Sequence, residues 1–528
     1  MPEDDSAQPT ERIYVSGRRA RTLGAALLIT LAAAVVPGSG HLVLRRRSGW
    51  YILAGFLALA VLAAVTALWV PRAELAGYVL SSNMLSVLMV GSVIVAGFWL
   101  ATVLYTYLQA RPHRLEASQR FAGAFVVTML CAGVVAPFGF AAYTANAQRN
   151  LLNALFPSGA LSAHGPAGDV EAIKKDRINI FLVGSDAGDG RIGTRTDTMV
   201  VASIDTSSGR TTLFSLPRNL AHAPFPPGSA MATEFPNGFG DRRDPASGFL
   251  NGVYAYGSDH PDQAPGEPSH NPGLNLLMST VSHIVGLTLD FYIQVNMNGF
   301  ASIIDALGGL EVNVGPDPVP MGGIGPFGEQ IKPFDWIPAG EQHLTGDQAL
   351  WFARSRKNSS DYVRMGRQRC LLQYLIDQKS PVDVLKNFQA VASATKDSVS
   401  TNIPQQLLPA LLQLAEKARS RSMDSVAFDP NMPDPDEPDG RFNTGNPDYD
   451  YVREVVRDII DEANEAERAE QSQPSSTTEQ PPAVARPPAG SGTPTQPSTA
   501  QDSPLPAGST PAPTSLGEVC GANAPTTH

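Results

Sequence analysis

Five arginines lie between residues 354 and 369 of this chain, and their spacing predicts a site for an anion. Arg354 and Arg356 are two residues apart, so in an extended segment both side chains point to the same side. Arg364 and Gln368 are four residues apart and share one face of a helix. Guanidinium groups stay charged at any working pH and bind phosphate oxygens through paired hydrogen bonds. The stretch therefore predicts a phosphate-binding site, although a solvated basic helix face would give the same pattern.

Other residues of this region have simpler interpretations. Arg369 lies off the helix face that Arg364 and Gln368 share, so we expect it to lie outside the site. Asp361 stands at the start of the same helix, and we expect it to cap the helix N-terminus. Several apolar residues could line a lipid groove, but apolar stripes at helical spacing usually pack in a core. They are Leu274, Leu277, Val281, Phe300, Leu371 and Leu375.

A second set of charged residues lies upstream, at the ends of three predicted strands. Asp186 follows the first strand, Arg195 and Asp197 precede the second, and Arg218 follows the third. Rigid strand ends can direct such side chains into one cleft. The two aspartates could instead cap turns, and the two arginines could form ordinary surface ion pairs. The strands are predicted at residues 178–184, 199–204 and 211–216.

The elements that would position these residues alternate between strands and helices. Residues 274–285 have helical spacing, and residues 291–295 have the apolar composition of a strand. This alternation predicts an α/β domain, a helix–sheet–helix sandwich, at residues 176–380. A helical extension is expected at residues 381–466. Its helices are predicted near residues 382–395, 404–418 and 448–466.

Four apolar runs near the start of the chain each approach the roughly 20 residues that span a bilayer as a helix. They are too many and too long for a cleavable signal peptide. The first run, residues 23–44, contains Pro37 and Gly38, which break helices, so we expect it to re-enter the membrane. The other three runs are expected to cross it, at residues 50–70, 85–108 and 121–143.

Positive charges set the expected orientation of this anchor, because basic loops favour the cytoplasmic side. Basic residues flank the first run on both sides, and three arginines lie between the third and fourth runs. With residues 1–22 in the cytoplasm and the first run re-entrant, residue 144 onward lies outside the cytoplasm. The chain is therefore expected to be a multi-pass protein of the cell membrane. No charged residue lies in the middle of the three spans, which favours an anchor over a transport pathway.

Composition limits what the rest of the chain can do. The 528 residues carry a formal net charge of −11, which argues against general binding of nucleic acid. Residues 144–175 are expected to be a linker, and residues 467–528 a disordered tail that buries too little apolar surface to fold. Cys131, Cys370 and Cys520 show neither metal-ligand spacing nor a disulfide framework, and we expect them to be chemically inert.

Short motifs occur in a fixed order along residues 176–380. They are Gly184-Ser185-Asp186, Arg195-Thr196-Asp197-Thr198, Ser215-Leu216-Pro217-Arg218, Asp305-Ala306-Leu307-Gly308-Gly309, Leu344-Thr345-Gly346, and Arg354-Ser355-Arg356 with Arg364 and Gln368. Each is weak alone, but the ordered set resembles the LytR-CpsA-Psr family of cell-envelope proteins. Members of that family have an extracytoplasmic α/β domain behind a membrane anchor. They transfer a glycopolymer from a polyprenyl-pyrophosphate carrier to peptidoglycan, with the help of magnesium.

The resemblance implies a role for each of the charged residues. Asp186 and Asp197 resemble the family's magnesium-binding carboxylates. Arg218 resembles its catalytic arginine, which would stabilise charge on the transferred phosphoryl group, because a guanidinium does not lose its proton in proteins. The residues that resemble its pyrophosphate clamp are Arg195, Arg354, Arg356, Arg364 and Gln368.

One position departs from the family pattern. An aspartate usually follows the proline–arginine pair, whereas this chain has Asn219, which could hydrogen-bond to Arg218 but supplies no charge. The implied function is a Mg²⁺-assisted phosphotransferase whose partners are a polyprenyl-pyrophosphate-linked glycopolymer, a peptidoglycan acceptor and the membrane, with no nucleic acid. The alternatives are a hydrolase of the same carrier and a lipid-binding protein without turnover. A transcriptional attenuator is disfavoured by the acidic composition and the lack of a helix-turn-helix pattern.

Overall fold

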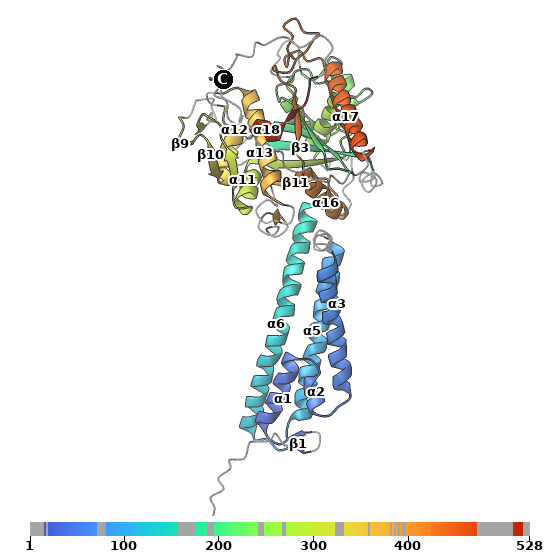
Figure 1. The fold of residues 1–528 in the computed structure, drawn as a ribbon, viewed down its shortest axis with the longest axis vertical. Helices are drawn as coiled ribbons and strands as arrows, with labels where there is room; N and C mark the ends of the chain where they lie inside the picture. Colours follow the sequence, from blue (N-terminus) through green and yellow to red (C-terminus); the bar gives the residue numbers. More distant parts are fainter. Residues whose placement is uncertain are drawn as a thin grey trace, which may run out of the picture. The chain divides into compact units, whose positions relative to one another are not determined.

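The computed structural model divides the chain into two compact units, Met1–Ala154 and Leu155–His528 (Figure 1). Most of the helix expected at 382–395 lies outside the described residues, as does the segment 157–174 of the expected linker. The structure describes residues 15–16, 19–70, 81–156, 175–186, 195–240, 248–266, 271–322, 332–356, 359–380, 383–384, 387, 391, 398–421, 423–472 and 511–520.

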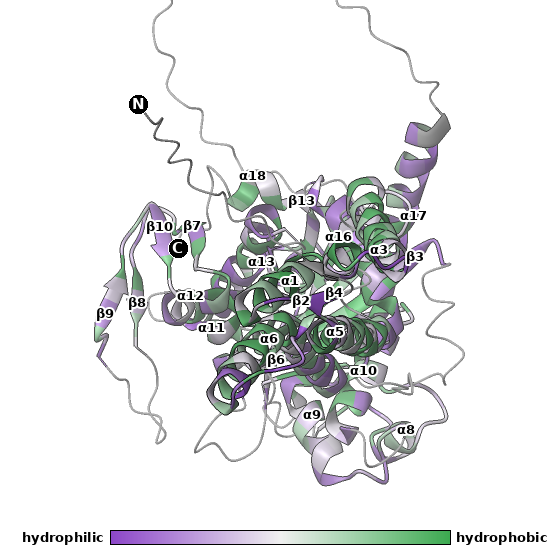
Figure 2. Ribbon diagram, turned by 90° about the horizontal axis from the view of Figure 1, so that it is seen from below, coloured by the Kyte–Doolittle hydropathy of each residue, from purple (hydrophilic) through white to green (hydrophobic). Residues whose placement is uncertain are grey.

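Three helices of the first unit are long and apolar enough to cross a membrane. Large apolar side chains are exposed along all three, as a surface that faces lipid requires. The ribbons of these helices are coloured largely as hydrophobic in Figure 2. The last helix includes residues 144–155, which were expected in a linker, because this segment contains no glycine or proline to end the helix. The three helices are α3 (Ser48–Trp69), α5 (Ser82–Ala110) and α6 (Ala117–Leu155).

The first apolar run forms two short helices, α1 (Leu23–Val35) and α2 (Ser39–Val43). Between them, Gly38 has a φ of 88°, and a Cβ at this position would lie 2.6 Å from the backbone oxygen of Gly49. Only glycine fits such a turn. At 13 residues, α1 is too short to span a bilayer alone. That this segment re-enters a membrane stays a prediction.

A mixed seven-stranded sheet forms the centre of the second unit, in the order β11-β6-β3-β4-β5-β12-β13. β3 pairs antiparallel with β4 and parallel with β6, and β5 pairs antiparallel with β4 and parallel with β12. The strands are β3 (Arg177–Ser185), β4 (Thr196–Asp205), β5 (Thr211–Ser215), β6 (Phe291–Asn296), β11 (Val399–Thr401), β12 (Asp424–Ala427) and β13 (Thr514–Ser515).

Helices and two small hairpin-like sheets surround this centre. The helices are α8 (Ala230–Glu234), α9 (Leu250–Asp259), α10 (Pro272–Val285), α11 (Met297–Ala306), α12 (Gly346–Arg354), α13 (Asp361–Gln378), η3 (Gln405–Leu407), α16 (Leu408–Arg419), α17 (Tyr449–Ser472) and α18 (Leu516–Cys520). The small sheets pair β7 (Leu310–Asn313) with β10 (Glu341–Leu344) and β8 (Val319–Met321) with β9 (Asp335–Ile337).

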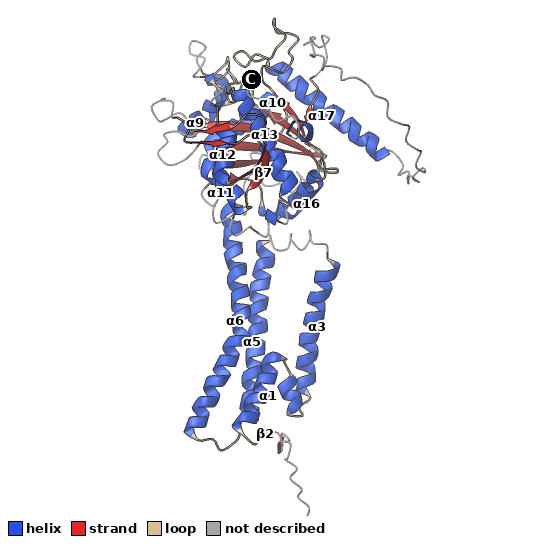
Figure 3. Cartoon of the chain, turned by 60° about the vertical axis from the view of Figure 1, so that its left-hand side comes forward, coloured by secondary structure: helices blue, strands red, loops and turns tan. Residues whose placement is uncertain are grey.

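Helices cover both faces of the central sheet, because its strands are apolar on both sides (Figure 3). Phe181 of β3 packs in one core cluster with Leu277 of α10 and Val456 of α17. Ile180, whose side chain leaves the opposite face of β3, packs with Leu414 of α16. The α/β fold predicted from the alternation of elements is confirmed.

The apolar residues that could have lined a lipid groove pack in the interior instead. Leu274, Leu277 and Val281 of α10 are fully buried, and Leu371 of α13 is nearly so. Phe300 and Leu375 are partly buried; together with the buried Leu371, they belong to a second core cluster that includes Ile337, Leu344 and Phe352. This second cluster holds α12 and α13, the two helices that carry the arginine segment.

Residues 511–520 correct the expectation of disorder for this part of the tail, and their disulfide corrects the expectation that Cys370 and Cys520 are inert. Residues 473–510 and 521–528 of the expected tail lie outside the described residues. Cys520 forms a disulfide with Cys370 of α13, 150 residues away in sequence. β13 extends the central sheet beside β12, Leu516 is buried, and the hydroxyl of Tyr374 donates to the backbone oxygen of Cys520. The expectation failed because 511–520 needs little apolar surface of its own when a disulfide and an existing sheet edge hold it. We call residues 511–520 the C-terminal strap.

Candidate active site

The ends of β3 and β4 hold the first two predicted site residues. The backbone N–H of Arg195 donates to Asp186 Oδ1 at 2.7 Å, and the backbone N–H of Asp186 donates to the oxygen of Arg195 at 3.0 Å. Asp186 thus does cap a backbone amide, which was its alternative role. The side chain of Arg195 is exposed. The loop 187–194 between them lies outside the described residues.

Asp197 sits at an irregularity of the sheet that redirects its side chain. Gly184 pairs with Thr198 and Ser185 with Thr196, so Asp197 is the extra residue of a β-bulge. A Cβ on Gly184 would lie 2.9 Å from Cβ of Thr198, so the close approach of the two strands here requires glycine. Bulges commonly reorient a side chain next to an active site.

Arg218 follows β5 and bridges two carboxylates. Its Nη1 lies 2.5 Å from Asp197 Oδ1, and its Nε lies 3.5 Å from Asp361 Oδ1. Burial alone would lower the pKa of Arg218, but the charges of Asp197 and then Asp361 raise it. The side chain of Arg218 remains 22% exposed.

Asp361 lies at the centre of the charged residues and does not cap its helix. The cap of α13 is Ser360, whose Oγ accepts from the N–H of Val363 at 3.2 Å. Asp361 instead accepts hydrogen bonds from Nε and Nη2 of Arg364 at 3.2 and 3.0 Å, and its Oδ1 lies 3.7 Å from Nη1 of Arg356. The expected capping role is therefore wrong, because three guanidinium groups compete for this carboxylate.

The surroundings of Asp361 stabilise its charged form. Burial alone would raise its pKa, but the hydrogen bonds and charge of Arg364, followed by the charges of Arg218 and Arg356, lower it below the usual value. We call these four residues with Asp197 the arginine cluster. It contains three guanidinium groups and two carboxylates, so it has an excess of positive charge.

The arginines of this cluster differ in accessibility. Arg364 is buried, and its Nη1 donates to the backbone oxygen of Asp197 at 2.9 Å. It ties α13 to the bulge of β4 and positions the other groups. Arg356 is 43% exposed. Burial lowers the pKa of Arg356, and the positive charges of Arg218 and Arg364 lower it further. The negative charge of Asp361 partly offsets this. Arg218 and Arg356 are thus the groups that can meet a ligand.

Two residues predicted for the pyrophosphate clamp make other contacts. The guanidinium carbon of Arg354 lies 5.4 Å from the ring centroid of Trp351. Gln368 donates through Nε2 to the backbone oxygen of Ala353 at 3.1 Å, which satisfies an acceptor at the end of α12. Gln368 is one helical turn from Arg364, as its spacing predicted. Its amide group, however, hydrogen-bonds to the end of α12 and so helps to join α12 to α13.

Two further arginines of the segment have structural roles. Arg367 donates to the backbone oxygen of Ser355 and to Ser359 Oγ, the latter at 3.1 Å, and so holds the connection between α12 and α13. Burial and then the charge of Arg364 lower its pKa to about 10. Arg369 donates to Ser425 Oγ of β12 at 3.3 Å, in agreement with its expected place outside the site.

Asn219 does not take the role that its position suggested. Its Nδ2 donates to Thr444 Oγ1 at 3.4 Å, and its Oδ1 is buried without a hydrogen-bond partner. The expected hydrogen bond to Arg218 is therefore not formed. Asp361 from α13 supplies the negative charge beside Arg218 that Asn219 lacks.

The donor set for a metal ion is limited. Within the described ranges, no three His, Cys, Asp or Glu residues are grouped so that they could hold a metal. Asp186 and Asp197 stand at the adjoining ends of β3 and β4. Mg²⁺ is commonly held by one or two carboxylates together with phosphate oxygens and water, which fits this pair. The magnesium site stays a prediction.

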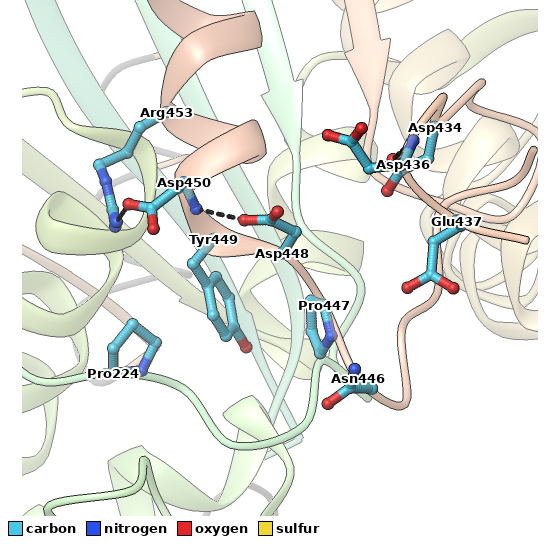
Figure 4. Close-up of a pocket in the computed structure, with 10 residues that line it drawn as sticks. All are labelled: Pro224, Asp434, Asp436, Glu437, Asn446, Pro447, Asp448, Tyr449, Asp450 and Arg453. Carbon is cyan, nitrogen blue, oxygen red and sulfur yellow. Dashed lines mark hydrogen bonds and ion pairs between the residues drawn. The ribbon is translucent and has the colours of Figure 1, made fainter.

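A separate hollow of about 500 Å³ in the same unit is lined mainly by carboxylates (Figure 4). Asp434 Oδ1 accepts from the N–H of Asp436 at 3.1 Å, and Arg453 is ion-paired with Asp450. None of the predicted site residues lines it. We call it the acidic hollow; it is lined by Pro224, Asp434, Asp436, Glu437, Asn446, Pro447, Asp448, Tyr449, Asp450 and Arg453.

Comparison with known proteins finds relatives for this unit. The model of the LytR_cpsA_psr family matches residues 158–437. The polyisoprenyl-teichoic acid–peptidoglycan teichoic acid transferase TagU of Bacillus mycoides is 28% identical over 235 residues, which are 44% of this chain and 62% of that protein. TagU of Enterococcus faecalis is 27% identical over 247 residues, 44% of this chain and 67% of that protein. The crystal structure of B. subtilis TagV aligns with a TM-score of 0.37 at 23% identity, over 54% of this chain and 98% of that one.

Proposed function

The chain belongs to the LytR_cpsA_psr family, whose model matches more than half of it, and we propose that it transfers a glycopolymer to peptidoglycan in cell-wall assembly. In this proposal the donor is a polyprenyl-pyrophosphate-linked glycopolymer, and the reaction is a phosphoryl transfer. The names of the similar TagU proteins, which mention a polyisoprenyl-linked teichoic acid and peptidoglycan, support the class of substrate. The single observation in this chain that carries the proposal is the arginine cluster.

Arg218 and Arg356 bind the pyrophosphate in this account. Both are partly exposed, and Arg356 lies 3.7 Å from its carboxylate partner, farther than a close ion pair. Phosphate oxygens can therefore replace the carboxylate oxygen as partner of Arg356, whereas Arg218 would bind them while it stays paired with Asp197. Phosphoryl transfer depends mainly on positioning and on stabilising negative charge, which fixed arginines provide.

Asp361 and Arg364 act through position rather than contact with the substrate. Asp361 orients Arg218 and Arg356, and the buried Arg364 fixes Asp361 against the bulge of β4. Arg195 is exposed at the start of β4 and can reach the outer phosphate oxygens. Mg²⁺, held by Asp186 and Asp197, would neutralise charge on the phosphates.

The proposed step is a displacement at phosphorus. The oxygen of a peptidoglycan hydroxyl forms a bond to the phosphorus nearest the glycan, and its proton passes to water. The bond from that phosphorus to the bridging oxygen breaks, and polyprenyl phosphate leaves with the electron pair. Arg218 stabilises the charge that develops on the phosphoryl oxygens. Water in place of the sugar hydroxyl would give hydrolysis with the same residues.

We place the second unit outside the cytoplasm, in a multi-pass protein of the cell membrane. Three apolar helices support an anchor, and the arginines between the third and fourth apolar runs support this orientation. Alkaline phosphatase fused after residue 472 should be active, because it folds only outside the cytoplasm. An inactive fusion that is present at normal levels would contradict this placement.

The transfer itself can be measured with the full chain in lipid nanodiscs. The assay contains Mg²⁺, a labelled oligosaccharide on polyprenyl pyrophosphate and nascent peptidoglycan, and it records label attached covalently to the glycan strand. Attachment that needs both Arg218 and Mg²⁺ is the expected result. Release of free sugar phosphate without attachment would replace the transferase by a hydrolase, and bound but unreacted lipid would replace it by a lipid-binding protein.

A further inference from the structure

Two aromatic side chains on one hairpin stand out on the surface of the second unit. Phe334 is 67% exposed and Trp336 is 44% exposed. Within the part of this unit that the structure describes, no other large hydrophobic side chain is exposed. Large apolar rings that remain in water commonly mark a binding surface.

These rings belong to a row that leads to the arginine segment. Phe334 stands at a bend directly before β9, and Trp336 lies within this strand, two residues further on. The ring of Phe334 meets that of Trp351 edge to face, with centroids 5.6 Å apart. The guanidinium of Arg354 lies over the ring of Trp351. Phe334, Trp351 and Arg354 therefore form a continuous run of contacts, and the exposed Trp336 follows Phe334 by two residues.

The hairpin that carries the row is anchored beside the arginine cluster. Ile337, the residue after Trp336, is fully buried in the core cluster of α12 and α13. Pro320 pairs with Trp336 across the hairpin, and its backbone oxygen accepts a hydrogen bond from Ser355 Oγ at 2.8 Å. Ser355 precedes Arg356 in the chain. The hydrogen bond between Ser355 and Pro320 therefore ties the hairpin that carries the rings to the residue before Arg356.

We propose that Phe334, Trp336, Trp351 and Arg354 form a platform that binds a pyranose ring of a glycan. The C–H groups of a sugar ring pack on aromatic faces, while its hydroxyl groups need polar partners at the rim, which Arg354 provides. Among the described residues of this unit, no large aliphatic side chain is exposed beside these rings, so the exposed apolar surface here is aromatic.

This inference deepens the proposed function and rests on it, because the ring belongs either to the donor glycopolymer or to the peptidoglycan acceptor. It also gives Arg354 a different partner from the one the sequence suggested. Arg354 contacts the glycan, whereas Arg218 and Arg356 contact the pyrophosphate.

The test measures binding to the full chain in nanodiscs by calorimetry, with three probes. A peptidoglycan tetrasaccharide represents the acceptor, N-acetylglucosamine 1-phosphate the donor sugar, and geranylgeranyl pyrophosphate the lipid carrier. Phe334→Ala and Trp336→Ala should weaken binding of at least one sugar probe tenfold or more. Trp336→Phe, which keeps a ring, should weaken it less. Asp335→Asn, a change at the neighbouring position of the same strand, should leave it unchanged.

Geranylgeranyl pyrophosphate should bind all four variants as it binds the native chain. The platform is overturned if Trp336→Ala binds both sugar probes as the native chain does, or if the native chain binds neither. A loss of the lipid probe instead of the sugars would reassign the rings to the carrier. Sugar binding that persists while the native chain fails to bind geranylgeranyl pyrophosphate would disprove the proposed function and leave the platform intact.

Discussion

In the arginine cluster three guanidinium groups surround two carboxylates, whereas the acidic hollow gathers five carboxylates around one arginine. Both regions belong to the same unit; Asp361 of the cluster is partly buried, and Asp434 of the hollow is buried. In the cluster, hydrogen bonds from Arg364 and nearby positive charges outweigh burial and lower the pKa of Asp361. In the hollow, burial followed by the charges of Asp436 and Asp448 raises the pKa of Asp434.

Because of this difference, we propose the arginine cluster rather than the acidic hollow as the site. The acidic hollow offers space, but its charge repels a pyrophosphate. The arginine cluster presents two partly exposed guanidinium groups, those of Arg218 after β5 and Arg356 between α12 and α13. Their carboxylate partners stand at the bulge of β4 and at the start of α13. Electrostatic complementarity, rather than volume, is our reason for proposing the cluster as the phosphate site.

The largest expected effect is the difference in transfer rate between two arginine substitutions, one in each region. Arg218→Ala should lower the rate of glycopolymer transfer by about 10²–10³-fold, because it removes a donor aimed at developing charge. Arg453→Ala, the same change in the acidic hollow, should alter the rate by less than about twofold. Radiolabel transferred to peptidoglycan by the two variants in nanodiscs measures both effects, and equal losses would erase the distinction between the regions.

The next effect concerns the disulfide that fastens the C-terminal strap to α13. Cys520→Ser should lower the free energy of unfolding by about 2–4 kcal/mol, because the unfolded chain regains the freedom that the cross-link removes. Hydrogen exchange should rise in α13, which carries the cluster, and change little in α17, beside the hollow. Chemical unfolding with and without a reductant measures the first part. A native chain that is indifferent to reductant would show that the strap contributes no stability.

A smaller expected effect is that the aspartates of the two regions contribute to stability with different pH dependence. A carboxyl group whose pKa is lowered by folding stabilises the fold above its unfolded pKa of about 3.9 and loses this contribution as the pH falls through the lower folded value. Asp361→Asn should therefore reduce stability at pH 7 by about 1–3 kcal/mol, because it loses charged hydrogen bonds. The difference from the native chain should shrink below about pH 4. A difference that is the same at pH 7 and pH 3 would argue against charge as its cause.

The smallest effect has the opposite sign. Folding raises the pKa of Asp434, so its contribution is fully present below about pH 3.9 and is lost as the pH rises through the folded value. Asp434→Asn can keep the hydrogen bond from Asp436 and should raise stability at pH 7 by up to about 1 kcal/mol. Urea unfolding at pH 7 and pH 4 tests this. Destabilisation at pH 7 would contradict this prediction and would mean that a bound cation neutralises the carboxylates of the acidic hollow.

Local patterns predicted the strands and the residues at their ends, because buried strands and their boundaries leave a direct mark on composition. Asp186, Asp197 and Arg218 were found in this way, and Asp197 and Arg218 do meet. Spacing failed where a side chain has two possible partners. Gln368 shares a helix face with Arg364 in the sequence pattern, but it binds the end of α12 instead.

Two features could not be predicted because their partners are far apart in the sequence. Cys370 and Cys520 are separated by 150 residues, and no spacing rule joins them. Asp361 was interpreted as a cap because that role is common at this position. Its spacing of three residues from Arg364 was a signal for an ion pair on a helix. The contact between Asp361 and Arg218 depends on how α13 packs beside the end of β5, so the sequence pattern alone could not predict it.

Binding of geranylgeranyl pyrophosphate tests the central claim most directly, because this probe carries the pyrophosphate without a glycan. The comparison uses the native chain, Arg356→Ala and Arg453→Ala in nanodiscs with Mg²⁺, measured by calorimetry. Removal of the partly exposed Arg356 should weaken binding by about 10–100-fold, equivalent to roughly 1.4–2.7 kcal/mol. Arg453→Ala should bind as the native chain does. Unchanged binding by Arg356→Ala, or an equal loss in Arg453→Ala, would contradict the assignment of the pyrophosphate to the arginine cluster.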